Sequence, residues 1–330
     1  MVIDHDVRVR SRGWLLLGAG VLVVALVAGT FGWATWAAKT YESDFDRWDS
    51  EERRHVNGSV RIPISAYGYW YPIGDQELKE QAGGCDEVRA LRPALVAATG
   101  KMPRVTNLPV DWLGPAYGKA VDRDHRRARI VKSFSDAATS VLKQMERDCA
   151  FDGKVLRLES LSGVQWDKAD KLALPASSPL CGDKEGCIPY DAARRRKYAS
   201  ALVKANDHQR SVESLFRTDD CGRTSFGAAC EDVADAMDRW IDAQGAYNWQ
   251  VRALTATTSG FAVNKAGNRA DRAYRKFEKT LRRILPKQYP GVEDVTDFKD
   301  DPTSTDAFLS AVTSLRVEKL HDARTALRKL

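Results

Sequence analysis

The chain has 330 residues, with 51 Lys or Arg against 45 Asp or Glu, which gives a formal net charge of +6. The first 38 residues contribute three Arg and two Asp, so the remainder holds 48 basic and 43 acidic side chains. This mild excess does not argue for nucleic acid, and we expect no nucleic-acid partner. It is compatible with anionic partners at an envelope surface.

The first predicted element is a membrane-spanning helix over residues 13–38, which follows a short cytoplasmic tail at residues 1–12. The segment contains no charged side chain, and its helical length of about 39 Å exceeds the roughly 30 Å of a hydrocarbon core. Trp14 at one end and Trp33 and Trp36 at the other suit the two membrane interfaces. A cleaved signal peptide is the alternative, but its apolar run would span only about 7 to 15 residues. The sequence therefore favours a single-pass anchor.

Residues 39–58 are predicted to continue this helix as an amphipathic stalk, because Tyr41, Phe45 and Trp48 recur at helical spacing. The remainder, residues 59–330, would form the extracytoplasmic domain. It opens with an extended segment at residues 59–72, in which Pro63 rules out a central strand. The aromatic run of this segment (Tyr67, Tyr69, Trp70 and Tyr71) could stack on a sugar ring, lie against the membrane surface or pack over the bundle.

Beyond this segment, apolar side chains recur every three or four residues, which predicts a mainly α-helical bundle with little or no β-structure. Residues 75–99 indicate a weaker helix, interrupted at Gly83-Gly84 and at Pro93. Residues 152–190 are the least helical, and residues 154–159 could form a short strand. The soluble part is either one helical domain or two, and residues 152–190 are the boundary if there are two. The four apolar stripes are Val131, Phe134, Ala138, Leu142, Met145, Cys149; Tyr198, Leu202, Ala205, Val212, Leu215; Phe226, Cys230, Val233, Met237, Trp240, Tyr247, Val251, Leu254; and Val263, Ala266, Ala270, Tyr274, Phe277, Leu281, Ile284.

All six cysteines follow the predicted membrane helix and form an even set: Cys85, Cys149, Cys181, Cys187, Cys221 and Cys230. Short Gly-containing loops predict local disulfides between 181 and 187 and between 221 and 230, which leaves 85 to pair with 149 by elimination. Zinc binding and unpaired buried thiols are the alternatives, and the spacing is unlike that of structural zinc sites. Disulfides persist in oxidising compartments, so we expect the domain outside the cytoplasmic membrane and the N-terminus inside. The Lys and Arg flanking the membrane helix are too balanced to decide its orientation.

The most specific pattern is a row of basic residues, which we call the basic stripe: Lys265, Arg269, Arg272, Lys276, Lys279 and Arg283. It steps by three and four residues over about 27 Å of helix and faces away from the apolar stripe. Residues 263–285 contain eight basic and two acidic side chains. This face could bind anionic lipid headgroups, an anionic envelope polymer or an acidic protein. The alternative is a solvated face with ordinary pairs from Asp271 to Arg275 and from Glu278 to Arg282.

The preceding helix carries an acidic stripe of four residues: Glu231, Asp235, Asp238 and Asp242. Two molecules could pair this stripe with the basic stripe in trans, so self-association is one interpretation. Two solvated faces of opposite charge are the other. Di-metal helical bundles use Glu-x-x-His motifs, which this helix lacks, so we expect no metal and no cofactor.

No catalytic motif supports an enzyme. The sequence contains no G-x-S-x-G, no phosphate-binding G-x-x-x-x-G-K-[ST], no H-E-x-x-H and no C-x-x-C. His208 and Gln244 fall in gaps of two apolar stripes, and we interpret them as a hydrogen-bonded core pair rather than as an acid or base.

These features together predict a membrane-anchored envelope protein whose helical domain is a binding or scaffold module for an anionic or protein partner. Two alternatives stay open. One is an enzyme acting on envelope components, with a site assembled from scattered residues. The other is an accessory subunit of a larger membrane complex.

Overall fold

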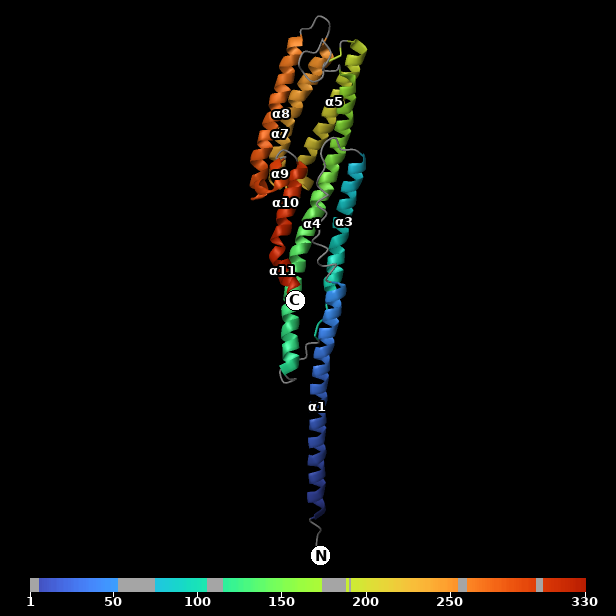
Figure 1. Cartoon of the computed structure of the whole chain (residues 1–330), viewed down its shortest axis with the longest axis vertical. Helices are drawn as coiled ribbons and strands as arrows, with labels where there is room; N and C mark the ends of the chain where they lie inside the picture. Colours follow the sequence, from blue (N-terminus) through green and yellow to red (C-terminus); the bar gives the residue numbers. More distant parts are fainter. Residues whose placement is uncertain are drawn as a thin grey trace. The chain divides into compact units, whose positions relative to one another are not determined.

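In the described part of the chain the regular structure is helical, which confirms the predicted mainly α fold (Figure 1). The computed structural model describes residues 6–52, 75–105, 115–173, 188–189, 191–254, 260–300 and 305–330, and these ranges contain no β-strand. The helices are α1 (Asp6–Glu51), α3 (Asp75–Gly100), α4 (Pro115–Leu172), α5 (Ala192–Phe216), α6 (Asp219–Gly222), α7 (Ala229–Ala253), α8 (Gly260–Gln288), α9 (Thr296–Asp300), α10 (Thr305–Lys319) and α11 (His321–Arg328), with a 3-10 turn, η2, at Val292–Asp294.

The chain divides into two compact units that alternate along the sequence. Unit 1 comprises Met1–Arg61, Pro93–Ala138 and Asp322–Leu330, whereas unit 2 comprises Ile62–Arg92 and Thr139–His321. Both α3 and α4 therefore contribute residues to each unit. The described residues of 152–190, the boundary if the soluble part forms two domains, belong to unit 2.

The apolar side chains of the predicted stalk lie in the core of unit 1. Tyr41, Phe45 and Trp48 are all buried, and the rings of Phe45 and Trp48 lie 5.4 Å apart. The indole nitrogen of Trp48 donates a hydrogen bond to the carbonyl oxygen of Ala98 in α3 at 2.8 Å. The guanidinium of Arg127 in α4 lies 3.7 Å over the Phe45 ring, a cation–π contact. The C-terminal part of α1 is therefore an integral helix of this unit.

The membrane-spanning segment predicted within α1, residues 13–38, is not supported by the structure. Within the described residues, no helix is long and apolar enough to cross a membrane. The side chains of α1 are described from Val27 onward, so those of residues 13–26 of the predicted membrane segment lie outside the described part.

Unit 2 is a bundle in which α5, α7 and α8 lie side by side (Figure 1). Ala169 of α4 packs against Ala201 and Leu202 of α5, with Trp166 and Tyr247 against this cluster. The side chains of all four predicted apolar stripes are buried or half-buried, apart from Tyr274, which is 40% exposed. The helical period of the sequence therefore identified the core faces correctly.

The predicted strand at residues 154–159 is wrong, because α4 continues as one helix to Leu172. Phe151, Val155, Ser162 and Ala169 are buried at steps of four and seven residues, which is the period of a helix and not of a strand. The predicted interruptions of the helix at residues 75–99 are wrong too. The Gly83-Gly84 pair and Pro93 all lie inside α3.

Two of the three predicted disulfides are confirmed, and both belong to unit 2. Cys85 joins Cys149 with a Cα–Cα distance of 5.7 Å, and Cys221 joins Cys230 at 6.0 Å. The first links α3 to α4, and the second closes the loop before α7, which turns through Gly227 in the left-handed region (φ +50°) that favours glycine. Several predictions fall outside the described residues, namely the 181–187 disulfide, the end of the stalk at 53–58, and the extended segment 59–72 with its aromatic run.

Candidate functional site

The basic stripe lies on the outer face of α8. All six of its side chains are exposed: Lys265, Arg269, Arg272, Lys276, Lys279 and Arg283. The opposite face of the helix is apolar and packs against α7, where the ring of Phe277 stacks on Trp240 at 5.7 Å. Because this packing fixes the rotation of α8, the six cations point to solvent together as a row.

In the described part of the chain, no carboxylate lies within 4.0 Å of a cation of the basic stripe. The helical pairs that a solvated face predicts, Asp271 with Arg275 and Glu278 with Arg282, are not formed either. The positive charge of α8 is therefore not compensated by ion pairs within these parts of the molecule. Such a row of like charges raises the local concentration of anions.

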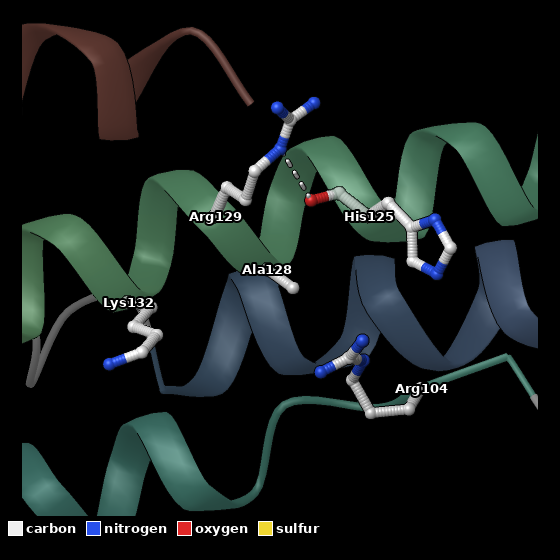
Figure 2. A pocket seen from close by; sticks show the side chains of 5 residues that line it. All are labelled: Arg104, His125, Ala128, Arg129 and Lys132. Carbon is white, nitrogen blue, oxygen red and sulfur yellow. Dashed lines mark hydrogen bonds between the residues drawn. The ribbon is translucent and has the colours of Figure 1, made fainter.

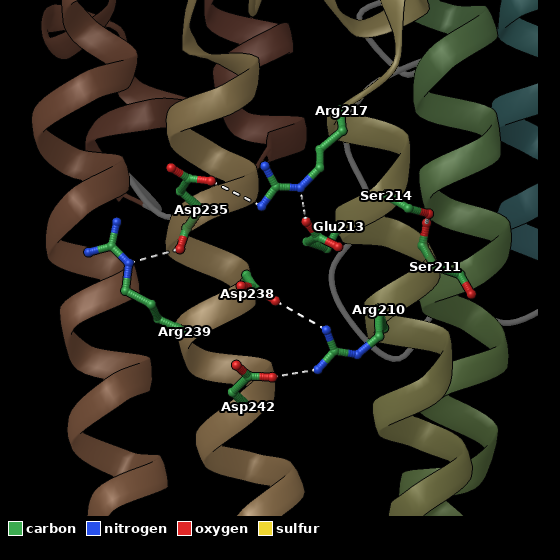
Figure 3. Close-up of polar contacts among 9 residues, drawn as sticks. All are labelled: Arg210, Ser211, Glu213, Ser214, Arg217, Asp235, Asp238, Arg239 and Asp242. Carbon is green, nitrogen blue, oxygen red and sulfur yellow. Dashed lines mark hydrogen bonds and ion pairs between the residues drawn. The ribbon is translucent and has the colours of Figure 1, made fainter.

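Most of the acidic stripe of α7 is ion-paired with two arginines, Arg210 of α5 and Arg217, the residue that follows α5 (Figure 3). Arg210 contacts Asp238 at 3.1 Å and Asp242 at 2.6 Å, so one guanidinium bridges two turns of α7. Arg217 contacts Asp235 at 3.0 Å. It also donates a hydrogen bond to Glu213, one turn earlier on its own helix. Three of the four acidic side chains thus have partners within unit 2.

The fourth acidic residue, Glu231, is exposed on the first turn of α7 and has no ion-pair partner among the described residues. The hydrogen bond to Asp242 raises the pKa of Arg210, and the hydrogen bond to Glu213 raises the pKa of Arg217. Both arginines therefore stay cationic and keep the acidic stripe neutralised. Sequence reasoning missed this pairing. The available signal was the seven-residue spacing of the two arginines, which places Arg217, at the end of α5, about two turns beyond Arg210 on the same face.

A fully buried carboxylate in α4, Asp148, is the other polar centre of unit 2. It accepts hydrogen bonds from the backbone nitrogen of Ser225 at 2.7 Å, from Gln144 at 3.1 Å and from the guanidinium of Arg316 at 3.2 Å. The Ser225 hydroxyl donates to it as well. Burial raises the pKa of Asp148, while the hydrogen bond from Ser225 acts in the opposite direction. Its acceptor positions are filled, so it connects α4, the disulfide loop and α10 rather than facing a substrate.

The predicted core pair between His208 and Gln244 is not formed among the described hydrogen bonds. Gln244 donates instead to Asn248 at 3.2 Å on its own helix. The buried polar contact between α4 and α5 joins the neighbouring residue, Gln209, to Ser162 at 3.2 Å. The polar gap in the apolar stripe therefore located the buried polar contact of α5 to within one residue: Gln209 makes it, and the predicted His208 does not.

In the described ranges, no group of three or more His, Cys, Asp or Glu side chains could hold a metal ion. No protein-family model, curated protein or solved structure matches this chain.

Proposed function

We propose that this chain is a single-pass protein of the cytoplasmic membrane, with its N-terminus inside and its helical domain outside. In this proposal the domain is a binding or scaffold module, and the basic stripe of α8 takes a linear polyanion of the envelope. The uncharged residues 13–38 support the anchor, because their length fits a bilayer. The disulfides Cys85–Cys149 and Cys221–Cys230 support an oxidising compartment.

The observation that carries the binding proposal is a contrast between two adjacent helices. Three of the four acidic side chains of the acidic stripe have arginine partners at or just after the end of α5, whereas the basic side chains of α8 are exposed and lack carboxylate partners in the described residues. An anion from outside these parts of the molecule would supply the missing counter-charge.

The arrangement of the stripe favours a linear polyanion over a small anion. Its cations follow one another at steps of about 5 Å along the helix axis, over about 27 Å in total. A small anion would contact one or two of them. A polymer with repeating phosphodiester or carboxylate groups would contact the whole row, and its affinity would fall as salt screens the charges.

Self-association through the acidic stripe is not part of this proposal. Pairing α7 with α8 of a second molecule would first require Asp235, Asp238 and Asp242 to leave Arg210 and Arg217.

The test is polyanion binding by the full-length chain in neutral detergent micelles, with fluorescent polyglutamate and polyphosphate as probes. The triple reversal K265E/R272E/K279E should weaken binding at low salt by at least about tenfold, at roughly 1 kcal/mol or more per charge. Raising the salt concentration should weaken binding by the unaltered chain as well.

The matched control is R196E/K197E/K204E on α5, which makes the same change in net charge at three exposed positions. With all variants measured at about 0.1 M salt, this control should keep its affinity within about twofold, because a net-charge effect alone is then screened within roughly 10 Å. Equal losses in both variants would mean that binding follows net charge and not the stripe, and the proposal would then be wrong.

A further inference from the structure

Unit 1 contains a pocket between α4 and the short helix α11, which we call the α4–α11 pocket. Four of its lining residues belong to α4 and two to α11, namely Arg126, Arg129, Ile130, Ser133, Ala323 and Ala326. Its volume of about 310 Å³ is at the lower end of small-molecule sites, which span roughly 300–1,000 Å³. This volume equals that of roughly ten water molecules at about 30 Å³ each, so a ligand that fits it has to be small.

The two helices present these residues because their other faces are buried within the unit. Val131 and Phe134 of α4 are 3% and 0% exposed, and Leu327 of α11 is fully buried. Arg126 and Ser133 lie two turns apart on another face of α4, which is turned away from these two buried side chains. The packing of both helices therefore fixes the direction in which the lining residues point.

The two arginines of the pocket lack a counter-charge in the described residues. Both are exposed, and no carboxylate of the described chain lies within 4.0 Å of Arg126 or Arg129. Nε of Arg129 donates to the carbonyl oxygen of His125 on its own helix at 3.4 Å, which leaves the terminal nitrogens for a ligand. Figure 2 shows this guanidinium on the opposite side of α4 from Arg104.

The cations on the Arg104 side of α4 are paired, in contrast to those of the α4–α11 pocket. Arg104 donates to both oxygens of the buried Asp124, at 3.0 and 3.1 Å. Lys132, which Figure 2 shows on this same side, contacts Asp136 at 2.8 Å. An added anion would have to compete with these carboxylates there, whereas at Arg126 and Arg129 it would supply the missing counter-charge.

The lining combines an apolar floor with donors for an anion. Ile130, Ala323 and Ala326 supply apolar surface, and all three are half-buried. A guanidinium presents paired donors that match the two oxygens of a carboxylate, and the hydroxyl of Ser133 adds a further donor. A small hydrated anion would use the donors alone, and a neutral apolar molecule would use the floor alone. An anion that carries a short apolar group would use both.

We propose that the α4–α11 pocket binds a small monocarboxylate that carries a short aliphatic or aromatic group. The carboxylate contacts Arg126, Arg129 and Ser133, while the apolar group lies against the alanines of α11. This inference depends neither on the polyanion binding by α8 nor on the membrane anchoring proposed above.

The test is equilibrium dialysis of radiolabelled phenylpropanoate with the full-length chain in neutral detergent micelles, with empty micelles as the blank. At about 0.1 M salt, where distant charges are screened, R126Q/R129Q should weaken binding by at least about tenfold. The reason is the loss of the charge-assisted hydrogen bonds to the carboxylate. Unlabelled phenylpropanoate should displace the probe at concentrations at least about tenfold lower than either phenylpropanamide or acetate, because each of these uses only part of the lining.

The matched control is K143Q/R147Q, which removes two exposed charges one turn apart elsewhere on α4. It should keep its affinity within about twofold. Equal losses in both pairs overturn the proposal, and so does a loss with K265E/R272E/K279E alone, because α8 would then hold the anion.

A326L tests the apolar floor without changing the charge. Leu is a strong helix former, so α11 is retained, and its larger side chain fills part of the pocket. Binding of phenylpropanoate should fall by at least about tenfold in this variant as well. Unchanged binding in A326L, or displacement by acetate at the same concentration as by phenylpropanoate, overturns the apolar part of the proposed ligand.

Discussion

At the scale of single residues, the buried carboxylate Asp148 connects parts of unit 2 that are far apart in the sequence. Its partners come from α4, from the loop closed by the Cys221–Cys230 disulfide and from α10. Arg316 is largely buried, and its remaining contacts are a hydrogen bond to the Ser225 hydroxyl at 2.8 Å and a cation–π contact with Tyr289 at 5.3 Å. Removal of the carboxylate would leave this charge without its counter-ion.

We therefore expect Asp148→Ala to lower the free energy of unfolding by about 3–5 kcal/mol, the cost of breaking a buried ion pair from one side. Denaturant unfolding with the disulfides intact measures this change. Asp136→Ala removes an exposed carboxylate from the same helix and should cost only about 0–1 kcal/mol. Similar values for the two variants would show that the Asp148 contacts do not stabilise the unit.

Asp148 should also make the free energy of unfolding depend on pH. Burial raises the folded-state pKa of Asp148 above its unfolded value, so the stability that it contributes is present below the unfolded pKa and is lost as pH rises through the folded pKa. Asp148→Asn cannot titrate. The stability of wild type relative to D148N should therefore decrease as pH rises above about 4, the ordinary pKa of an aspartate, measured by denaturant unfolding. An increase over that range would contradict the assigned direction.

The side-chain pairing of unit 2 was the part least accessible to sequence reasoning. The acidic stripe was found because its members share one helix face, but its partners Arg210 and Arg217 lie on another helix. Which face of α5 meets which face of α7 depends on the crossing of the two helices, and a period in one segment does not specify that crossing. Arg104 and Asp124 in unit 1 were missed for the same reason.

At the scale of elements, periodicity located the helices and their buried faces, whereas helix ends and continuity were predicted less well. The glycine pair and Pro93 suggested breaks in α3, but one Pro or Gly costs only about 1–3 kcal/mol in a helix, which packing can offset. The predicted strand at 154–159 failed because short apolar runs do not separate strand from helix without the longer pattern around them. For α1, the spacing of Tyr41, Phe45 and Trp48 correctly predicted a helix with one apolar face. It did not predict that this face is buried in the core of unit 1.

The burial of α1 makes Phe45 a critical residue of unit 1. Phe45→Ala should cost about 3–5 kcal/mol, because the ring is buried and also supports the Arg127 guanidinium. Hydrogen exchange of the amides in α1 and in residues 117–134 of α4 should accelerate accordingly. Ser43→Ala, an exposed change on the same helix, is the control, and a freely exposed stalk would show equal exchange in both variants.

At the scale of the whole molecule, the predicted orientation can be tested through the cysteines. If the domain lies outside the membrane with its disulfides formed, a membrane-impermeant maleimide should label intact cells only after reduction. A variant that lacks Cys221 and Cys230 together should still show this pattern through Cys85 and Cys149. Labelling that requires permeabilised cells but no reductant would instead place the domain, with free thiols, in the cytoplasm.

The alternation of the two units along the chain has a consequence for biosynthesis. Unit 1 contains Asp322–Leu330, which the ribosome reaches only after it has made all of unit 2. At about 5–20 residues per second, translation of Thr139–His321 takes roughly 10–40 s. During that interval Leu327, which is fully buried in the folded unit, has not yet been synthesised. The species that folding factors meet during synthesis is therefore an incomplete unit 1, with α1 and the start of α4 already available and their last partner still to come.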